Sequence, residues 1–196
     1  MKRRTLSFLV VALFTVTASM AARVNATSQE VQKPNLPSVQ AQANASQPIP
    51  VALPTQAEIV MKGGEKRDGR VVEIDEKGQK LWIQGSREKR SLPLSQIDKI
   101  VFPNNAVVYR TNGVQFIRGE TPAGTNTQVK WNGIPIGDFR LIDAVKGQAE
   151  VKLRSLVVNR GQLRAILAVA KDRQFVVDEM KFEPQKKTVT ILVTPY

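Results

Sequence analysis

The chain has 196 residues, and its 29 Lys and Arg against 17 Asp and Glu give a formal net charge of +12. It contains no His and no Cys, which excludes thiol catalysis, disulfides, haem ligation, zinc–thiolate sites and any Ser-His-Asp relay. An enzyme of this composition needs a Lys base, a pair of carboxylates or a metal held by oxygen ligands.

The first 26 residues have the pattern of a secretory signal peptide. Basic residues at positions 2–4 precede an apolar run over 6–18, which is shorter than the ~20 residues that span a bilayer as a helix. Small residues permit cleavage after Ala21 or after Ala26, and both sites stay open. Since positions 1–26 hold four basic and no acidic residues, cleavage lowers the net charge from +12 to +8. We expect a mature chain that is extracytoplasmic, either periplasmic or secreted.

Residues 27–55 predict a disordered linker. They are rich in Gln, Pro, Ala, Asn and Ser, carry one Lys and one Glu, and show no apolar period. We expect this segment to act as a tether that lets a folded part reach its partner.

Short apolar runs separated by turn residues begin at Ala57 and predict β-strands. The expected strands of this part are 58–61, 69–75, 80–84, 90–94 and 97–102, followed by a hairpin of 106–110 with 114–117. The segment 76–79 predicts a hairpin turn. Pro93 lacks an amide donor, so we expect it on an edge strand or at a bulge. The five short strands before this last hairpin predict a small β-barrel, and we place the bounds of the module at residues 56–118.

Residues 57–102 resemble SH3-like or Sm-like small β-barrels. The resemblance rests on an apolar first strand, then Lys62-Gly63-Gly64, then Gly69 at the start of a bent second strand, and a closing strand over 97–102. It implies the barrel fold and a role in peptide or protein docking. The loops that read RNA in Sm proteins correspond here to Glu76-Lys77-Gly78 and Pro103-Asn104-Asn105, which depart from the RNA-binding pattern. Nucleic acid is therefore not an expected partner.

A loop-like composition over 119–126 separates this part from a second apolar series. The expected strands of the second series are 128–131, 139–143, 149–153, 175–182 and 188–193. We therefore predict a separate β-rich module over 126–196.

The segment 161–171 admits two interpretations. Leu163, Ile166, Leu167 and Ala170 fall at helical spacing, and Asn159 precedes Gln162 as in a capping box. The alternative reads 159–161 as a hairpin loop within an unbroken antiparallel meander. The spacing favours the helix, so the predicted fold class is mainly β, of α+β type, with one helix over 161–171.

Candidate catalytic residues are few. Ser86 and Lys89 match a Ser-x-x-Lys spacing but lack the companion motifs of acylating enzymes. Two carboxylate pairs, Glu73 with Asp75 and Asp178 with Glu179, lack the spacing of a calcium loop. The chain has neither a phosphate-binding Gly-rich loop nor a dinucleotide motif. We therefore predict no catalytic residue, no metal site and no cofactor.

Trp82 is the best candidate for a binding residue. In the strand 80–84, Leu81 and Ile83 share one face and Trp82 shares the other with Lys80. If Leu81 and Ile83 fill the core, Trp82 points outward among basic residues. The predicted partner-binding residues are Trp82, Lys80, Arg87 and Lys89. The alternative is a Trp82 covered by the second module or capping the barrel.

These observations favour a non-enzymatic envelope protein that docks onto a protein assembly or an anionic surface. Its positive charge suits an envelope protein, an acidic polymer or a lipid surface as partner. The alternative function is a hydrolase of cell-wall polymer or peptide that uses carboxylates or a Ser-Lys pair. A structure in which the four candidate carboxylates lie apart would argue against that alternative.

Overall fold

A computed structural model describes residues 48–120, 128–156 and 160–196, all within one compact unit. The predicted signal peptide, most of the predicted linker and most of the loop 119–126 lie outside these ranges. The strands are β1 Pro48–Ala52, β2 Ala57–Met61, β3 Lys66–Asp75, β4 Lys80–Gln84, β5 Lys89–Pro93, β6 Ile97–Val101, β7 Val107–Tyr109, β8 Gln115–Ile117, β9 Val129–Pro135, β10 Phe139–Asp143, β11 Gln148–Lys152, β12 Phe175–Glu183 and β13 Thr188–Pro195. The helix α2 spans Arg160–Asp172, and short 3-10 turns η1 to η5 cover Leu94–Gln96, Arg118–Glu120, Ile136–Asp138, Leu153–Ser155 and Pro184–Lys186.

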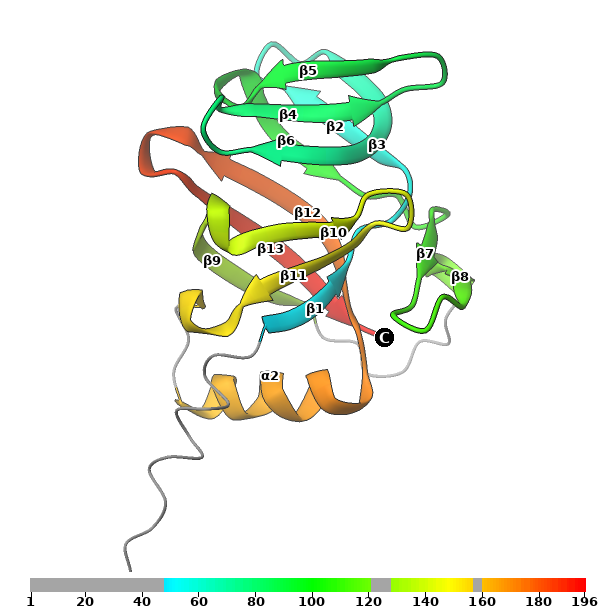
Figure 1. The fold of residues 1–196 in the computed structure, drawn as a ribbon, viewed down its shortest axis with the longest axis vertical. Coiled ribbons are helices and arrows are strands. Elements are labelled where there is room, and N and C mark those ends of the chain that lie inside the picture. The colour runs from blue at the N-terminus through cyan, green and yellow to red at the C-terminus, as the bar shows by residue number, and fades with distance from the viewer. Residues whose placement is uncertain (1–47, 121–127, 157–159) are drawn as a thin grey trace, which may run out of the picture. The chain divides into compact units, whose positions relative to one another are not determined.

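The strands form one large curled sheet in the order β10-β11-β1-β12-β6-β2-β3-β4-β5, with β13 joining β12 to β9 (Figure 1). β7 and β8 form a separate hairpin. The mainly β fold class with a helix near 161–171 is confirmed.

The curl depends on β3, which pairs with two neighbours through different halves. Its first half pairs with β2 up to Gly69, and its second half pairs with β4 from Arg70 onward. A Cβ at Gly69 would lie 3.0 Å from the carbonyl oxygen of Gln84. Gly69 therefore lets the strands approach closely where β3 changes partner.

The curled strands β2 to β6 form a half-barrel. The alternation of side chains along each strand determines which of them point into it. Leu81 and Ile83 of β4 are buried, as are Ile59 of β2 and Leu92 of β5. Among the described strands, β5 pairs only with β4, and Pro93 is its last residue. The prediction of an edge position for Pro93 is therefore confirmed.

The strand β1 corrects the predicted linker, which extended to residue 55. Ile49 and Val51 are 2% and 1% exposed, and β1 pairs antiparallel with β11 and parallel with β12. Pro48 and Pro50 obscured this strand in the sequence. Both lie where β1 has only β11 as a neighbour, because its ladder to β12 covers Val51 and Ala52 alone. A missing amide donor is tolerated on such an open side.

The two predicted modules, 56–118 and 126–196, share one sheet and one hydrophobic core, whereas separate cores were expected. β6 pairs with β12 through Val101 with Glu179 and Ile100 with Met180. One core cluster contains residues from both parts, including Ile59 and Val189.

The helix α2 lies against the sheet on the side of β1, β9 and β11 (Figure 1). Ile166 is buried, and Leu163, Leu167 and Ala170 pack against the core. The helical spacing therefore predicted the correct face. The alternative of an unbroken meander was wrong.

Candidate functional site

The outer face of β3, β4 and β5 carries the predicted binding residue Trp82. Trp82 is half-buried, while its neighbours Leu81 and Ile83 are 0% and 2% exposed. Cross-strand register places Glu73 of β3 and Ser91 of β5 beside Trp82. Trp82 therefore points away from the core, as strand alternation predicted.

Lys89 joins Trp82 to Glu73. Its Nζ lies 4.7 Å from the centroid of the Trp82 ring and donates a hydrogen bond of 2.9 Å to Oε2 of Glu73. We call Trp82, Lys89 and Glu73 the Trp82 cluster. Because Lys89 and Glu73 are 46% and 51% exposed, their ion pair contributes little to stability. Its effect is to hold an ammonium group over one face of the ring, where cation–π attraction is favourable.

The other two predicted binding residues lie farther from this cluster. Lys80 is exposed at the start of β4, and no ion pair of Lys80 is found within the described residues. Arg87 lies in the hairpin loop between β4 and β5 and lines a pocket with Ile83 and Arg90. The structure thus brings Trp82 and Lys89 together, and it places Lys80 at the start of β4 and Arg87 in the loop after its end.

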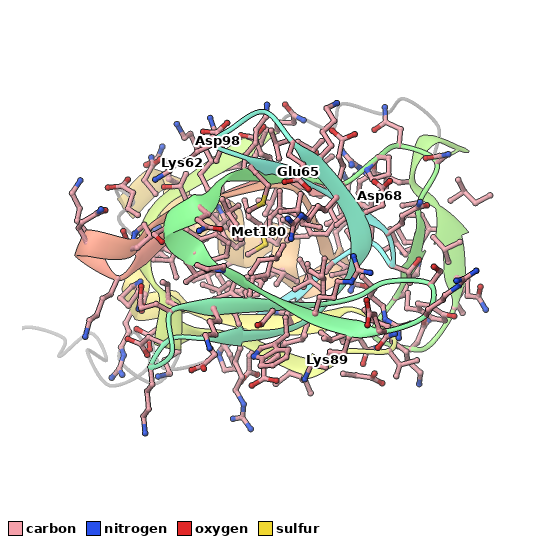
Figure 2. All side chains as sticks on the ribbon, turned by 90° about the horizontal axis from the view of Figure 1, so that it is seen from above. Lys62, Glu65, Asp68, Lys89, Asp98 and Met180 are labelled. Atoms are coloured by element: carbon pink, nitrogen blue, oxygen red, sulfur yellow. The ribbon has the colours of Figure 1, made fainter. Side chains whose placement is uncertain are left out.

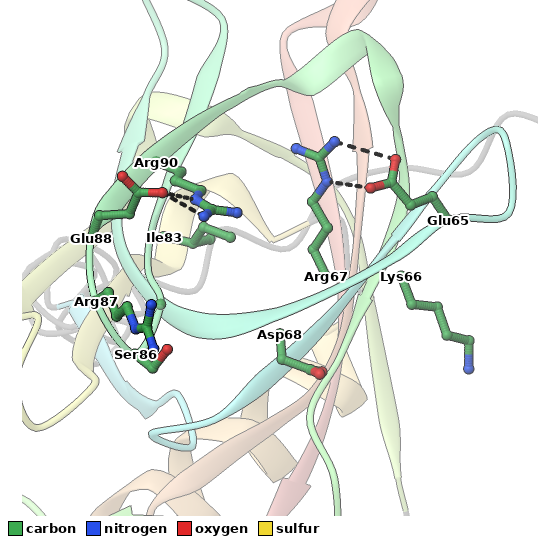
Figure 3. Close-up of a pocket in the computed structure, with 10 residues that line it drawn as sticks. Glu65, Lys66, Arg67, Asp68, Ile83, Ser86, Arg87, Glu88 and Arg90 are labelled. Carbon is green, nitrogen blue, oxygen red and sulfur yellow. Dashed lines mark hydrogen bonds and ion pairs between the residues drawn. The ribbon is translucent and has the colours of Figure 1, made fainter.

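The pocket beside Arg87 is open, charged and about 450 Å³ in volume (Figure 3). Its lining comes from the start of β3 and from the β4–β5 hairpin: Glu65, Lys66, Arg67, Asp68, Ile83, Gly85, Ser86, Arg87, Glu88 and Arg90. Figure 2 shows Lys89 on the opposite side of the half-barrel from Glu65 and Asp68, with Met180 between them. Ile83 lines the pocket and alternates with Trp82 along β4, so the pocket and the Trp82 cluster lie on different faces of this strand.

Most charges in this pocket are paired within it. Arg67 donates from Nε and Nη2 to the two carboxylate oxygens of Glu65, at 3.0 and 3.2 Å. This hydrogen-bonded partner lowers the pKa of Glu65 and raises that of Arg67. Arg90 Nε donates to Glu88 at 2.6 Å. Arg87 has no ion pair with any described residue, so it is the arginine of this pocket that is available to an anionic group.

The carboxylates of the hydrolase alternative do not converge. Glu73 pairs with Lys89, and Asp75 accepts the backbone N–H of Gly78 at 2.8 Å. Asp178 is buried in a separate contact, and Glu179 is paired with two lysines on the sheet, Lys99 at 3.4 Å and Lys181 at 3.6 Å. No hydrogen bond joins Ser86 to Lys89 in the described structure. The four carboxylates therefore act in distinct local contacts.

A buried ion pair between Arg118 and Asp178 was not predicted. The two groups are 2.5 Å apart and 8% and 4% exposed. Asp178 also accepts hydrogen bonds from Thr194 at 2.6 Å and Gln128 at 3.0 Å, and Arg118 donates to the carbonyl oxygen of Phe102. Burial raises the pKa of Asp178 and outweighs the opposite effects of these partners. Sixty positions separate the pair in the sequence, so no local pattern signals it.

No family profile matches the sequence, and neither curated proteins nor solved structures give a match. In the described ranges, no group of three or more acidic residues is arranged to hold a metal ion. No helix of the described part is long and apolar enough to span a membrane.

Proposed function

We propose that this chain is an extracytoplasmic, non-enzymatic binding module that docks onto an envelope protein through the Trp82 cluster. The observation that carries the proposal is the half-buried Trp82 on the outer face of the sheet, with the Lys89 ammonium group over its ring. Tryptophan is enriched among the residues that contribute most to protein interfaces.

Two further features support a protein partner. The cluster lies on paired strands, and Leu81 and Ile83 anchor β4 in the core, so docking costs little ordering of the backbone. The exposed Lys80 adds a positive charge at the start of the strand that carries Trp82, and it favours approach of a partner with an acidic rim. The extracytoplasmic location rests on the signal-peptide pattern of residues 1–26 and remains a prediction from the sequence.

The test uses immobilised full-length protein and an envelope extract. Proteins retained by the wild type are identified and purified, and their affinity is then measured against Trp82→Ala. We expect about 30-fold weaker binding, which corresponds to the loss of a central interface residue. Binding should also weaken as the salt concentration rises, because rim charges are screened.

The matched control is Val145→Ala, which truncates a side chain 64% exposed on the hairpin between β10 and β11. It should bind like the wild type. Far-UV circular dichroism and thermal unfolding of Trp82→Ala check its fold. The proposal is wrong if both variants bind equally, or if Trp82→Ala unfolds the domain, because the side chain would then serve the core.

A further inference from the structure

A second kind of cavity lies between α2 and the sheet, remote in the fold from the β4–β5 hairpin. Its volume is about 240 Å³. Residues from β9, α2, β12 and β13 line it: Val129, Lys130, Gln162, Ala165, Ile166, Phe175 and Pro195. It therefore forms where four elements meet.

The walls of this cavity are mainly apolar. Ile166 and Phe175 are 4% and 1% exposed, so they belong to the core and close the inner side of the cavity. Trp131 packs edge-on against Phe175, with the two ring centroids 4.9 Å apart. The arginine-rich pocket beside Arg87 has the opposite character. An apolar occupant of the α2 cavity would gain by leaving water.

The size of the cavity limits the shape of that occupant. Pockets for drug-sized ligands occupy ≈ 300–1,000 Å³, and this cavity is smaller than that range. A cavity of this volume suits a narrow hydrocarbon chain better than a multi-ring cofactor.

Lys130 supplies the one cationic group of the lining. It is exposed on β9, which pairs with β13 alone among the described strands. No described residue forms an ion pair with Lys130. A flexible lysine at an apolar opening can hold an anionic head group at the water boundary while the chain lies inside.

We propose that the cavity between α2 and β9 binds the chain of a medium-length fatty acid, with Lys130 holding the carboxylate. The hydrocarbon chain of the fatty acid lies against Ile166 and Phe175, and the small side chain of Ala165 leaves room for it. This site is independent of the Trp82 cluster.

Trp131 provides a direct measurement of binding. The chain has two Trp residues, so Trp82→Phe leaves Trp131 as the sole tryptophan, in contact with a wall of the cavity. Excitation at about 295 nm, where tyrosine absorbs little, then reports on Trp131. Titration of full-length Trp82→Phe with decanoate, below the concentration at which it forms micelles, should give a saturable fluorescence change. Shorter acids should bind more weakly, by about fourfold for each methylene removed. Binding without saturation, or without dependence on chain length, overturns the proposal.

Two substitutions on the same helix test the location. Ala165→Phe fills the cavity and should weaken decanoate binding at least tenfold. Ala168→Phe is the control, because Ala168 is exposed on α2 and does not line the cavity. Ala165→Leu replaces Ala165→Phe if the larger side chain disturbs the circular dichroism spectrum. Equal affinity of the position 165 and position 168 variants would place the ligand elsewhere.

A third comparison tests the head group. Decanol has the same chain without a charge and should bind about tenfold more weakly than decanoate to the wild-type cavity. In Lys130→Gln the two ligands should bind alike, because the ammonium group is gone. An unchanged preference for decanoate in Lys130→Gln would overturn the role given to Lys130.

Discussion

The charged side chains of this chain differ sharply in what they contribute, according to burial. Exposed pairs such as Lys89 with Glu73 contribute about 0–1 kcal/mol. The pair of Arg118 and Asp178 is almost fully buried. Arg118 follows β8 and Asp178 lies within β12, so this pair attaches the β7–β8 hairpin to the main sheet. Removing one partner leaves an uncompensated charge away from water.

We predict that Arg118→Met lowers the free energy of unfolding by about 3–5 kcal/mol at pH 7.5. The control is Lys99→Met, which breaks the half-exposed pair of Lys99 with Glu179 and should cost under about 1 kcal/mol. Urea unfolding followed by circular dichroism measures both losses. Equal losses for the two variants would contradict the importance given to the buried pair.

We also predict that the stability cost of Arg118→Met depends on pH. Because burial raises the pKa of Asp178 above its usual value of 3.8, the folded chain holds this proton more tightly than the unfolded chain does. The contribution of this group to stability is therefore complete at low pH and is lost as the pH rises through the raised pKa. Arg118→Met raises that pKa further, so its cost should be smaller at pH 4.5 than at pH 7.5. An equal cost at both pH values would show that Asp178 keeps the same charge at both.

Individual elements were predictable where the chain's own pattern determines them. The alternation in β4 gave its inward Leu81 and Ile83 and its outward Trp82, and the spacing in α2 gave its buried Ile166. The contact of Lys89 with Trp82 was not predictable in detail, because it depends on the register of β5 on β4. The α2 cavity was not predictable either, since its lining comes from four separate elements.

The strand β1 provides a prediction at the scale of the element. Ile49 is 2% exposed, so Ile49→Ala should lower the free energy of unfolding by about 2–5 kcal/mol. Were residues 48–52 part of a linker, the same change would cost under about 0.5 kcal/mol. The control is Ile142→Ala at a position 54% exposed, for which we expect such a small effect. Chemical unfolding of the two variants and the wild type makes the comparison.

At the scale of the whole molecule, the order of the strands in the sheet differs from their order in the sequence. β1 lies between β11 and β12, and β12 lies between β1 and β6 in the sheet order. Such pairings depend on which apolar faces fit together, and local periodicity carries no information about them. The sequence therefore indicated the strands of both modules but not the ladder of β6 with β12 that joins them.

The shared core predicts that the described part of the chain unfolds in one cooperative transition. Trp82 lies in β4 and Trp131 in β9, so each predicted module contains one of the two tryptophans. Trp82→Phe leaves a reporter in the second module, and Trp131→Phe leaves one in the first. Within each variant, the urea midpoint by fluorescence should equal the midpoint by far-UV circular dichroism, because a two-state transition looks the same to every probe. Comparing probes within one variant removes the effect of the substitution on stability. Two modules with independent cores would instead give a biphasic circular dichroism curve, with each tryptophan following only one of its phases, because no shared burial would couple their unfolding.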